Sequence, residues 1–157
     1  MLINIQTRPK FVKKSELIES LNYFGYNLLG KRLANNVEIN LINAPKNSGV
    51  WGMIDVEEYS RAPRSFLVSV YRLADRERYI RTLAHEMVHV KQVARRELKI
   101  PLLCYDKKYI VTRWHGKILK KKDADYEKHP WEIEADRVGD KLAAKYLKET
   151  GLTELSF

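Results

Sequence analysis

The spacing of apolar residues along the chain predicts three helices. In residues 15–30 apolar side chains recur every three or four positions, with Ser15 and Gly30 as typical residues for the start and the end. Residues 74–100 contain neither Gly nor Pro, and the middle of this segment is apolar nearly all round, which indicates a buried helix. A last amphipathic helix is expected over residues 131–149.

Alternating and continuous apolar runs predict strands between these helices. Residues 37–42, 50–58 and 65–72 are strand candidates that precede the second helix, with turn-rich sequences between them. Residues 109–111 and 113–119 favour a short hairpin after it. The order helix, three strands, helix, hairpin, helix predicts an α+β fold with a small three-stranded sheet, in one domain that spans the whole chain.

Composition narrows the class of protein. A chain of 157 residues with 45% hydrophobic residues is long enough to form one domain with a real core. It has no apolar run long enough to cross a bilayer, and residues 1–14 lack the apolar core of a signal peptide. Cys104 is the only cysteine, so we expect no disulfide framework and a reducing compartment. We therefore expect a cytoplasmic protein and take a monomer as its simplest state.

The formal net charge of +9 raises the question of an anionic partner. Basic residues gather in residues 107–128 and on the last helix. They are typical of a solvated surface, and they would equally suit non-specific binding of nucleic acid. No zinc-finger or RNA-binding motif accompanies them.

The most specific chemical signal is the HExxH sequence of residues 85–89. Two histidines four positions apart on a helix project from the same face, so His85 and His89 can ligate one zinc ion. Glu86 follows the first histidine, where its carboxylate can reach a water on the metal without binding the metal itself. The alternative is a pair of core histidines that hydrogen-bond to their neighbours.

A catalytic zinc needs a third protein ligand. The downstream candidates are His115, His129, Glu132 and Glu134. At helical spacing Glu132 shares a flank with Asp136 and with the small residues Gly139 and Ala143, which would let another helix approach closely.

Glu134 falls on the lysine-rich flank as an exposed partner of Arg137 or Lys141. This favours Glu132 as the ligand, with Asp136 accepting a hydrogen bond from the outer ring nitrogen of a ligating histidine. The two carboxylates also suit the N-terminal turns of a helix without any metal.

Two segments together resemble a known family. Residues 84–89 (AHEMVH) followed by residues 130–136 (PWEIEAD) are similar to small zinc metallopeptidases of bacteriophages that are described as SprT-like, and to the minimal gluzincins. The resemblance implies a zincin-like fold, one catalytic Zn²⁺, Glu132 as the third ligand and Asp136 in its outer shell. Shorter patterns at residues 63–66 and 114–116 extend it over most of residues 20–147.

The resemblance also leaves a rival and names further residues. Members of the true SprT branch use a histidine from an HG step such as His115–Gly116 as the third ligand, although His115 here could simply face solvent or stack on Trp114. Independently of the resemblance, Tyr126 is the first candidate for stabilising an oxyanion because it closely precedes the helix of Glu132, although it could equally be an ordinary loop tyrosine. His129 and His115 are the next candidates. By the same resemblance, residues 65–72 would form the sheet edge on which an extended substrate lies, although Phe66, Val68 and Val70 could equally be plain core.

The sequence thus predicts a zinc metallopeptidase in which Glu86 takes a proton from the zinc-bound water that attacks a peptide carbonyl. Two alternatives stay open. One is a DNA-associated protease that acts on DNA-bound proteins, and the other is a non-catalytic zinc-binding interaction module. Glu86 disfavours the second, because a structural zinc site needs no base and usually has four protein ligands.

Overall fold

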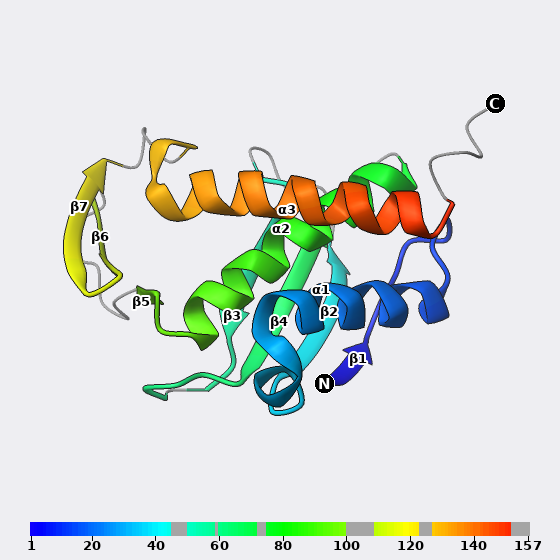
Figure 1. Cartoon of the computed structure of the whole chain (residues 1–157), viewed down its shortest axis with the longest axis horizontal. Coiled ribbons are helices and arrows are strands. Elements are labelled where there is room, and N and C mark those ends of the chain that lie inside the picture. Colours follow the sequence, from blue (N-terminus) through cyan, green and yellow to red (C-terminus); the bar gives the residue numbers. More distant parts are fainter. Residues whose placement is uncertain (45–49, 59, 72–74, 100–108, 123–126, 152–157) are drawn as a thin grey trace.

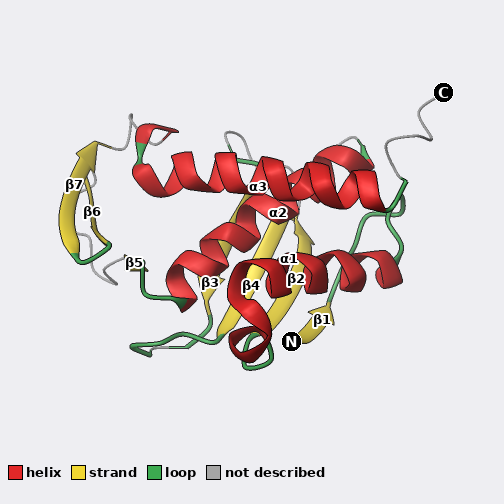
Figure 2. Cartoon of the chain, in the orientation of Figure 1, coloured by secondary structure: helices red, strands yellow, loops and turns green. Residues whose placement is uncertain are grey.

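The computed structural model describes residues 1–44, 50–58, 60–71, 75–99, 109–122 and 127–151. Its fold is α+β, as predicted, with three helices and two sheets among these residues (Figures 1 and 2). The helices are α1 (Lys14–Ala34), α2 (Arg76–Ala94) and α3 (Pro130–Glu149). Cys104 and Tyr126 lie outside the described residues, as do residues 107–108 and 123–126 of the basic segment 107–128.

The larger sheet has four strands in the order β1-β2-β4-β3. They are β1 (Leu2–Ile5), β2 (Glu38–Ala44), β3 (Gly52–Val56) and β4 (Ser65–Tyr71). The first three in that order run parallel to one another, and β3 pairs antiparallel with β4. The helices cover one face of this sheet, with α2 packed against the strands and against both other helices (Figure 1).

The smaller sheet is antiparallel and lies near the N-terminal end of α3 (Figure 1). It consists of β5 (Leu98–Lys99), β6 (Tyr109–Trp114) and β7 (Lys117–Lys122). The predicted hairpin is therefore present, but its turn is at His115–Gly116 and not near residue 112. Both turn residues have positive φ, of 46° and 80°, which is the geometry of a tight two-residue hairpin turn.

The prediction of a three-stranded sheet was wrong, because the chain also supplies β1 at its beginning. This strand has only four residues and alternates between exposed and half-buried positions. Its register is set by pairing with β2, where Ile3 lies opposite Ile39. Such a short strand carries little periodicity of its own, and its parallel partner lies far along the chain.

The predicted start and end of α1 also need correction. The helix begins at Lys14 after Lys13 as the N-cap residue, so Ser15 already lies inside it. Gly30 interrupts the helix with a φ of 75°, as its conformational freedom allows, but the chain resumes helical geometry as far as Ala34. Gly30 therefore marks a kink in α1 and not its end.

The helix that carries HExxH ends earlier than predicted. Arg96 has a φ of 61°, and the backbone N–H of Glu97 donates to the carbonyl of Gln92 over 2.8 Å. This is the Schellman arrangement that usually has Gly in the left-handed position. Because an arginine occupies it here, the residue type at this position does not signal that α2 ends at Ala94.

Residues 65–72 were expected to form an edge strand, and this was wrong. β4 lies between β2 and β3, and its Phe66, Val68 and Val70 are fully buried. The strand at that end of the sheet is β3, and none of the described residues pairs with its outer side. β3 also packs against α2, so the exposed edge is the one beside the HExxH helix.

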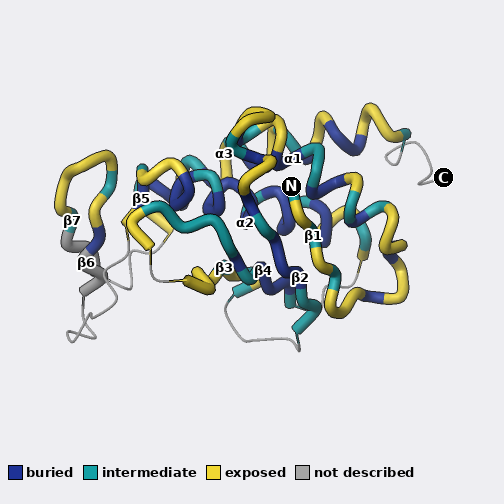
Figure 3. The backbone as a smooth tube through the Cα atoms, turned by 90° about the horizontal axis from the view of Figure 1, so that it is seen from below, coloured by how far each residue is buried: buried dark blue, intermediate teal, exposed yellow. Residues whose placement is uncertain are grey.

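The helices α2 and α3 cross at the first histidine of the motif. A Cβ atom on Gly139 would lie 3.0 Å from the Cα of His85, which is tighter than most Cβ contacts, so a larger residue would push against the backbone of α2. Ala143, one turn later, is fully buried. The predicted close approach of another helix to these small residues is confirmed. Figure 3 shows that buried positions are concentrated along α2 and the central strands.

No helix within the described ranges is both long enough and apolar enough to cross a membrane.

Candidate metal centre

The two histidines of the motif project from α2 with their Nε2 atoms converging. The Nε2 atoms of His85 and His89 lie 3.1 Å apart. His89 is buried, with 7% of its surface exposed, whereas His85 is half-buried and opens toward a pocket. The helical spacing of residues 85 and 89 thus produces the common face that their sequence separation predicts.

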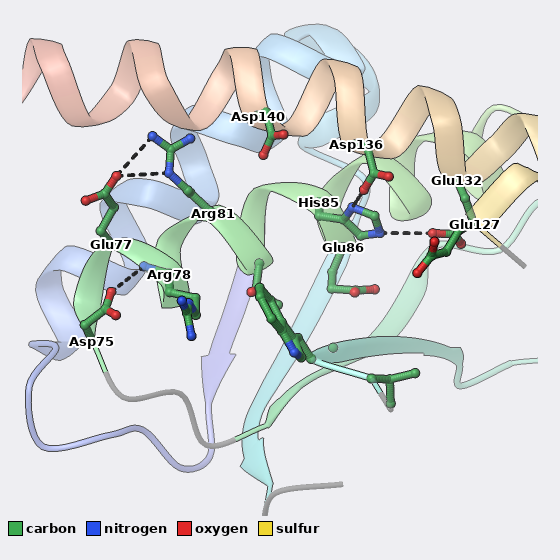
Figure 4. A pocket seen from close by; sticks show the side chains of 14 residues that line it. Asp75, Glu77, Arg78, Arg81, His85, Glu86, Glu127, Glu132, Asp136 and Asp140 are labelled. Atoms are coloured by element: carbon green, nitrogen blue, oxygen red, sulfur yellow. Dashed lines mark hydrogen bonds and ion pairs between the residues drawn. The ribbon is translucent and has the colours of Figure 1, made fainter. Parts of the chain in front are cut away.

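The carboxylate of Glu132 on α3 completes a triangle of donor groups with the two imidazoles, and Figure 4 shows its contact with His85. Its Oε2 lies 3.3 Å from Nε2 of His85, and its Oε1 lies 3.1 Å from Nε2 of His89. Tetrahedral coordination at about 2.0–2.1 Å separates neighbouring ligand atoms by about 3.3–3.4 Å. Although the two imidazoles face different oxygens of the carboxylate, the three side chains lie about as close together as the ligands of such a site, and His85, His89 and Glu132 could together hold a metal ion.

Each imidazole also has a partner for its Nδ1 atom. Nδ1 of His85 lies 3.0 Å from Oδ1 of Asp136, one turn after Glu132 on α3. Nδ1 of His89 lies 2.8 Å from Oε1 of Gln92. Asp136 therefore lies where the sequence suggested, whereas the contact of Gln92 was not foreseen. The only signal for it was its position three residues after His89, on the same side of α2.

Glu86 lies in the same pocket but outside the triangle of donors. Only 5% of the surface of Glu86 is exposed. This burial raises the pKa of its carboxyl to about 7, although the charges of the nearby His89 and His85 act in the opposite direction. A Cβ atom on Gly52 would lie 2.6 Å from Oε1 of Glu86, so the carboxylate rests against bare backbone of β3. Glycine at this position is what leaves room for Glu86.

The electrostatics of the site favour protons when no metal ion is bound. Burial lowers the pKa of His89, but the hydrogen bond and the charge of Glu132 outweigh it, so the pKa is raised overall. Glu132 likewise contributes to the raised pKa of Glu86. Protons thus offset the negative charge of the two buried carboxylates where a cation would otherwise do so.

The rival ligands of the sequence lie elsewhere. His115 is exposed in the β6–β7 turn, with its ring 4.3 Å from that of Trp114 in an edge arrangement. His129 is fully buried at the N-cap of α3, with its ring 4.7 Å from that of Trp131. Neither belongs to the donor cluster around His85. Tyr126 lies outside the described residues, so its proposed role stays a prediction.

The periodicity suggested that Glu134 is an exposed partner of Arg137 or Lys141, and this was wrong. Its Oε1 lies 2.9 Å from Nζ of Lys91 on α2, and the same Nζ lies 2.8 Å from Oε2 of Glu97. Glu134, Glu97 and His115 form a second group whose spacing would allow a metal ion. The ammonium of Lys91 already pairs with both carboxylates, so this group is a partly buried ion-pair network.

A pocket of about 950 Å³ opens over His85 and Glu86. Figure 4 shows Glu132 and Asp136 reaching from α3 toward His85, with Arg78 and Arg81 near the opposite end. Seven carboxylates and two guanidinium groups line the pocket, so its walls are acidic although the protein is basic. Its carboxylates are those of Asp75, Glu77, Glu86, Glu127, Glu132, Asp136 and Asp140.

Comparison with protein-family models, with curated proteins and with solved structures finds no match.

Replacing Glu132 should remove metal binding, whereas replacing Glu134 should not. Glu132→Ala deletes one of three donor atoms, and we expect its affinity for Zn²⁺ to fall by more than the roughly 10–100-fold typical of outer-shell changes. Glu134→Ala, two residues away on the same helix, loses only its contacts with Lys91 and Gln92. Metal content after dialysis and competition with a chromophoric chelator measure both variants. Loss of Zn²⁺ in Glu134→Ala but not in Glu132→Ala would reassign the ligand.

Cation binding should release protons near neutral pH. In the metal-free protein the raised pKa values of His89 and Glu86, about 7 for the latter, keep protons on these groups that a bound cation must displace. Affinity for Zn²⁺ should therefore fall as the pH drops below about 7. Calorimetric titration in buffers of different ionisation enthalpy measures the protons released. Equal heats in all buffers at pH 6.5 would contradict the expectation.

Proposed function

We propose that this protein is a zinc-dependent metallopeptidase. The observation that carries the proposal is the separation of roles among four buried or half-buried side chains. Two imidazoles and one carboxylate converge at 3.1–3.3 Å, while a fourth group, Glu86, lies beside them without joining the cluster. Three protein donors with a neighbouring base are the pattern of catalytic zinc sites, whereas structural sites usually have four donors.

The donor set suits zinc among the common metals. Two imidazole nitrogens and one carboxylate oxygen are a known catalytic zinc set, whereas Mg²⁺ and Ca²⁺ prefer oxygen donors alone. Bound there, zinc would supply a Lewis acid that lowers the pKa of a water and polarises a substrate carbonyl. The resemblance of residues 84–89 and 130–136 to SprT-like and minimal gluzincin peptidases supports the same choice.

Glu86 is the residue that moves protons in this proposal. Its carboxylate accepts a proton from the attacking water and passes it to the leaving amine. The low-polarity surroundings that raise its pKa to about 7 in the metal-free protein make it a stronger base than an exposed glutamate. Contact with the backbone at Gly52 keeps the carboxylate facing the pocket.

The sheet edge beside the pocket supports a peptide as substrate. Trp51 and Gly52 at the start of β3 line the pocket, and none of the described residues pairs with the outer side of this strand. An extended peptide can add to such an edge by main-chain hydrogen bonds, which would lay its carbonyl groups across the mouth of the pocket. This edge takes the role that the sequence assigned to residues 65–72.

The charge of the pocket argues against a phosphodiester as the group that reacts there. Its seven carboxylates outnumber its two guanidinium groups even after the double charge of a zinc ion is added. A nucleic-acid backbone would be repelled from these walls. The alternative of a DNA-associated protease would therefore need a separate basic surface for DNA, with a protein segment in the pocket.

Replacing Glu86 should separate metal binding from hydrolysis. Glu86→Gln keeps the side-chain volume beside Gly52 but removes the base, so we expect normal zinc content and a loss of hydrolysis of about 100-fold or more. Digestion of a peptide library by wild type, by this variant and by chelator-treated wild type measures the effect. Full activity of Glu86→Gln with zinc bound would refute the role as general base.

The acidic walls should favour basic substrates. Peptides with Lys or Arg near the cleaved bond should react faster than matched peptides with Glu, by about 10-fold at low salt, and added salt should reduce the difference. Asp140→Asn removes one exposed wall carboxylate that is not a metal donor, and it should narrow the preference without changing zinc content. Rates for the two peptide sets decide the matter, and a preference for acidic peptides would contradict it.

A further inference from the structure

The buried side chain of Gln92 has two well-placed partners at the metal centre. Gln92 is fully buried on α2, one turn after His89. Its Oε1 lies 2.8 Å from Nδ1 of His89, and its Nε2 donates to the backbone carbonyl of Trp131 over 2.9 Å. Trp131 immediately precedes Glu132 on α3, so one amide contacts one donor residue and the backbone beside another.

We propose that Gln92 is a positioning residue of the metal centre, which fixes the ring of His89 with Nε2 free for the cation and joins α2 to the first turn of α3. The inference rests on the proposed metal site. It does not require that the bound metal hydrolyse anything.

The direction of the amide follows from its partner on α3. A carbonyl oxygen can only accept a hydrogen bond, so the side of Gln92 that faces Trp131 must be its NH₂ group. The amide oxygen therefore faces His89. Because an amide oxygen also only accepts, Nδ1 of His89 is the nitrogen that donates to Gln92, and Nε2 is left to face Glu132 and the proposed cation site. A backbone carbonyl on α3 thus determines which nitrogen of His89 is available to a metal ion.

The absence of charge on Gln92 suits its surroundings. The Nδ1 atom of His85 has the carboxylate of Asp136 as its partner, and the side chain of Asp136 is 65% exposed to solvent. At His89 the corresponding place is fully buried and lies near Glu86 and Glu132, which are both already buried carboxylates. A third carboxylate there would add uncompensated buried charge, which is costly. A neutral amide orients the ring without that cost.

The contact with Trp131 links the two helices that carry the donors. His85 and His89 lie on α2, whereas Glu132 lies on α3, so their separations depend on how the two helices are held together. Metal–ligand distances tolerate changes of only about 0.2 Å. The hydrogen bond from Gln92 to Trp131 restrains the separation of the two helices at the N-terminal end of α3, where Glu132 lies.

The test compares Gln92→Met with Lys91→Met. The first variant keeps a buried side chain of similar length but makes neither hydrogen bond, and the second removes the neighbouring ion pairs with Glu97 and Glu134. We expect Gln92→Met to weaken Zn²⁺ binding by about 10–100-fold in chelator competition, as is typical of outer-shell partners. Lys91→Met should bind Zn²⁺ as tightly as wild type does.

A spectroscopic measurement separates positioning from a general loss of structure. Long-range ¹H–¹⁵N correlation spectra of the metal-free proteins, all carrying Glu132→Ala to remove the carboxylate that faces Nε2, report at a pH where the ring is neutral which nitrogen of His89 carries the hydrogen. We expect the Nδ1–H tautomer in this background and in Lys91→Met, and its loss in Gln92→Met. Gln92→Glu, which retains an acceptor for Nδ1 but no donor for Trp131, should keep this tautomer.

The possible results decide between the proposals. An unchanged tautomer in Gln92→Met, or equal loss of Zn²⁺ affinity in Lys91→Met, overturns the positioning role. If Gln92→Met does not fold, a lost Nδ1–H tautomer in Gln92→Glu overturns it instead. If both effects appear while wild type hydrolyses no peptide, the positioning role stands and the peptidase function falls. If hydrolysis depends on Glu86 while Gln92→Met behaves like wild type, the peptidase function stands and the positioning role falls.

Discussion

The close crossing of α2 and α3 is the contact on which the candidate metal centre depends. Gly139 lets the backbone of α3 approach His85 so closely that a Cβ atom would lie 3.0 Å from its Cα. This approach brings the carboxylate of Glu132 within 3.3 Å of both imidazoles. A larger residue at the crossing would separate the helices, and a shift of a few tenths of an ångström already exceeds what metal coordination tolerates.

The same crossing gathers groups that are costly to bury together. Glu86 and Glu132 are each 5% exposed, and the charge of Glu132 helps to raise the pKa of Glu86. Two carboxylates so close in a water-poor site repel one another, which works against the folded state. A bound cation would reverse the sign of this effect, so affinity for metal and stability of the fold are coupled through the same side chains. The arrangement is easier to explain by a function than by packing.

Local patterns were readable from the sequence, whereas long-range ones were not. The shared face of His85 and His89 and the inward flank of Glu132 follow from helical periodicity alone. The role of Gln92 depends on a carbonyl 39 residues later, and no periodicity encodes that contact. Arg96 ends α2 in a conformation usually taken by Gly, so its residue type concealed the boundary. The order of strands, which puts β3 and not β4 at the edge, is likewise a property of the whole sheet.

The contrast between a basic chain and an acidic pocket bears on what the site can bind. A formal charge of +9 suggests polyanions, but net charge acts at long range and is screened within about 10 Å at moderate salt. A ligand that enters the pocket is instead surrounded by carboxylates at short range, with Arg78 and Arg81 as the cations of its lining. Arg81 is paired with Glu77, and once this neutral pair is set aside six carboxylates face the single guanidinium of Arg78. The local field therefore favours a neutral or cationic ligand beside His85, whatever the rest of the surface attracts.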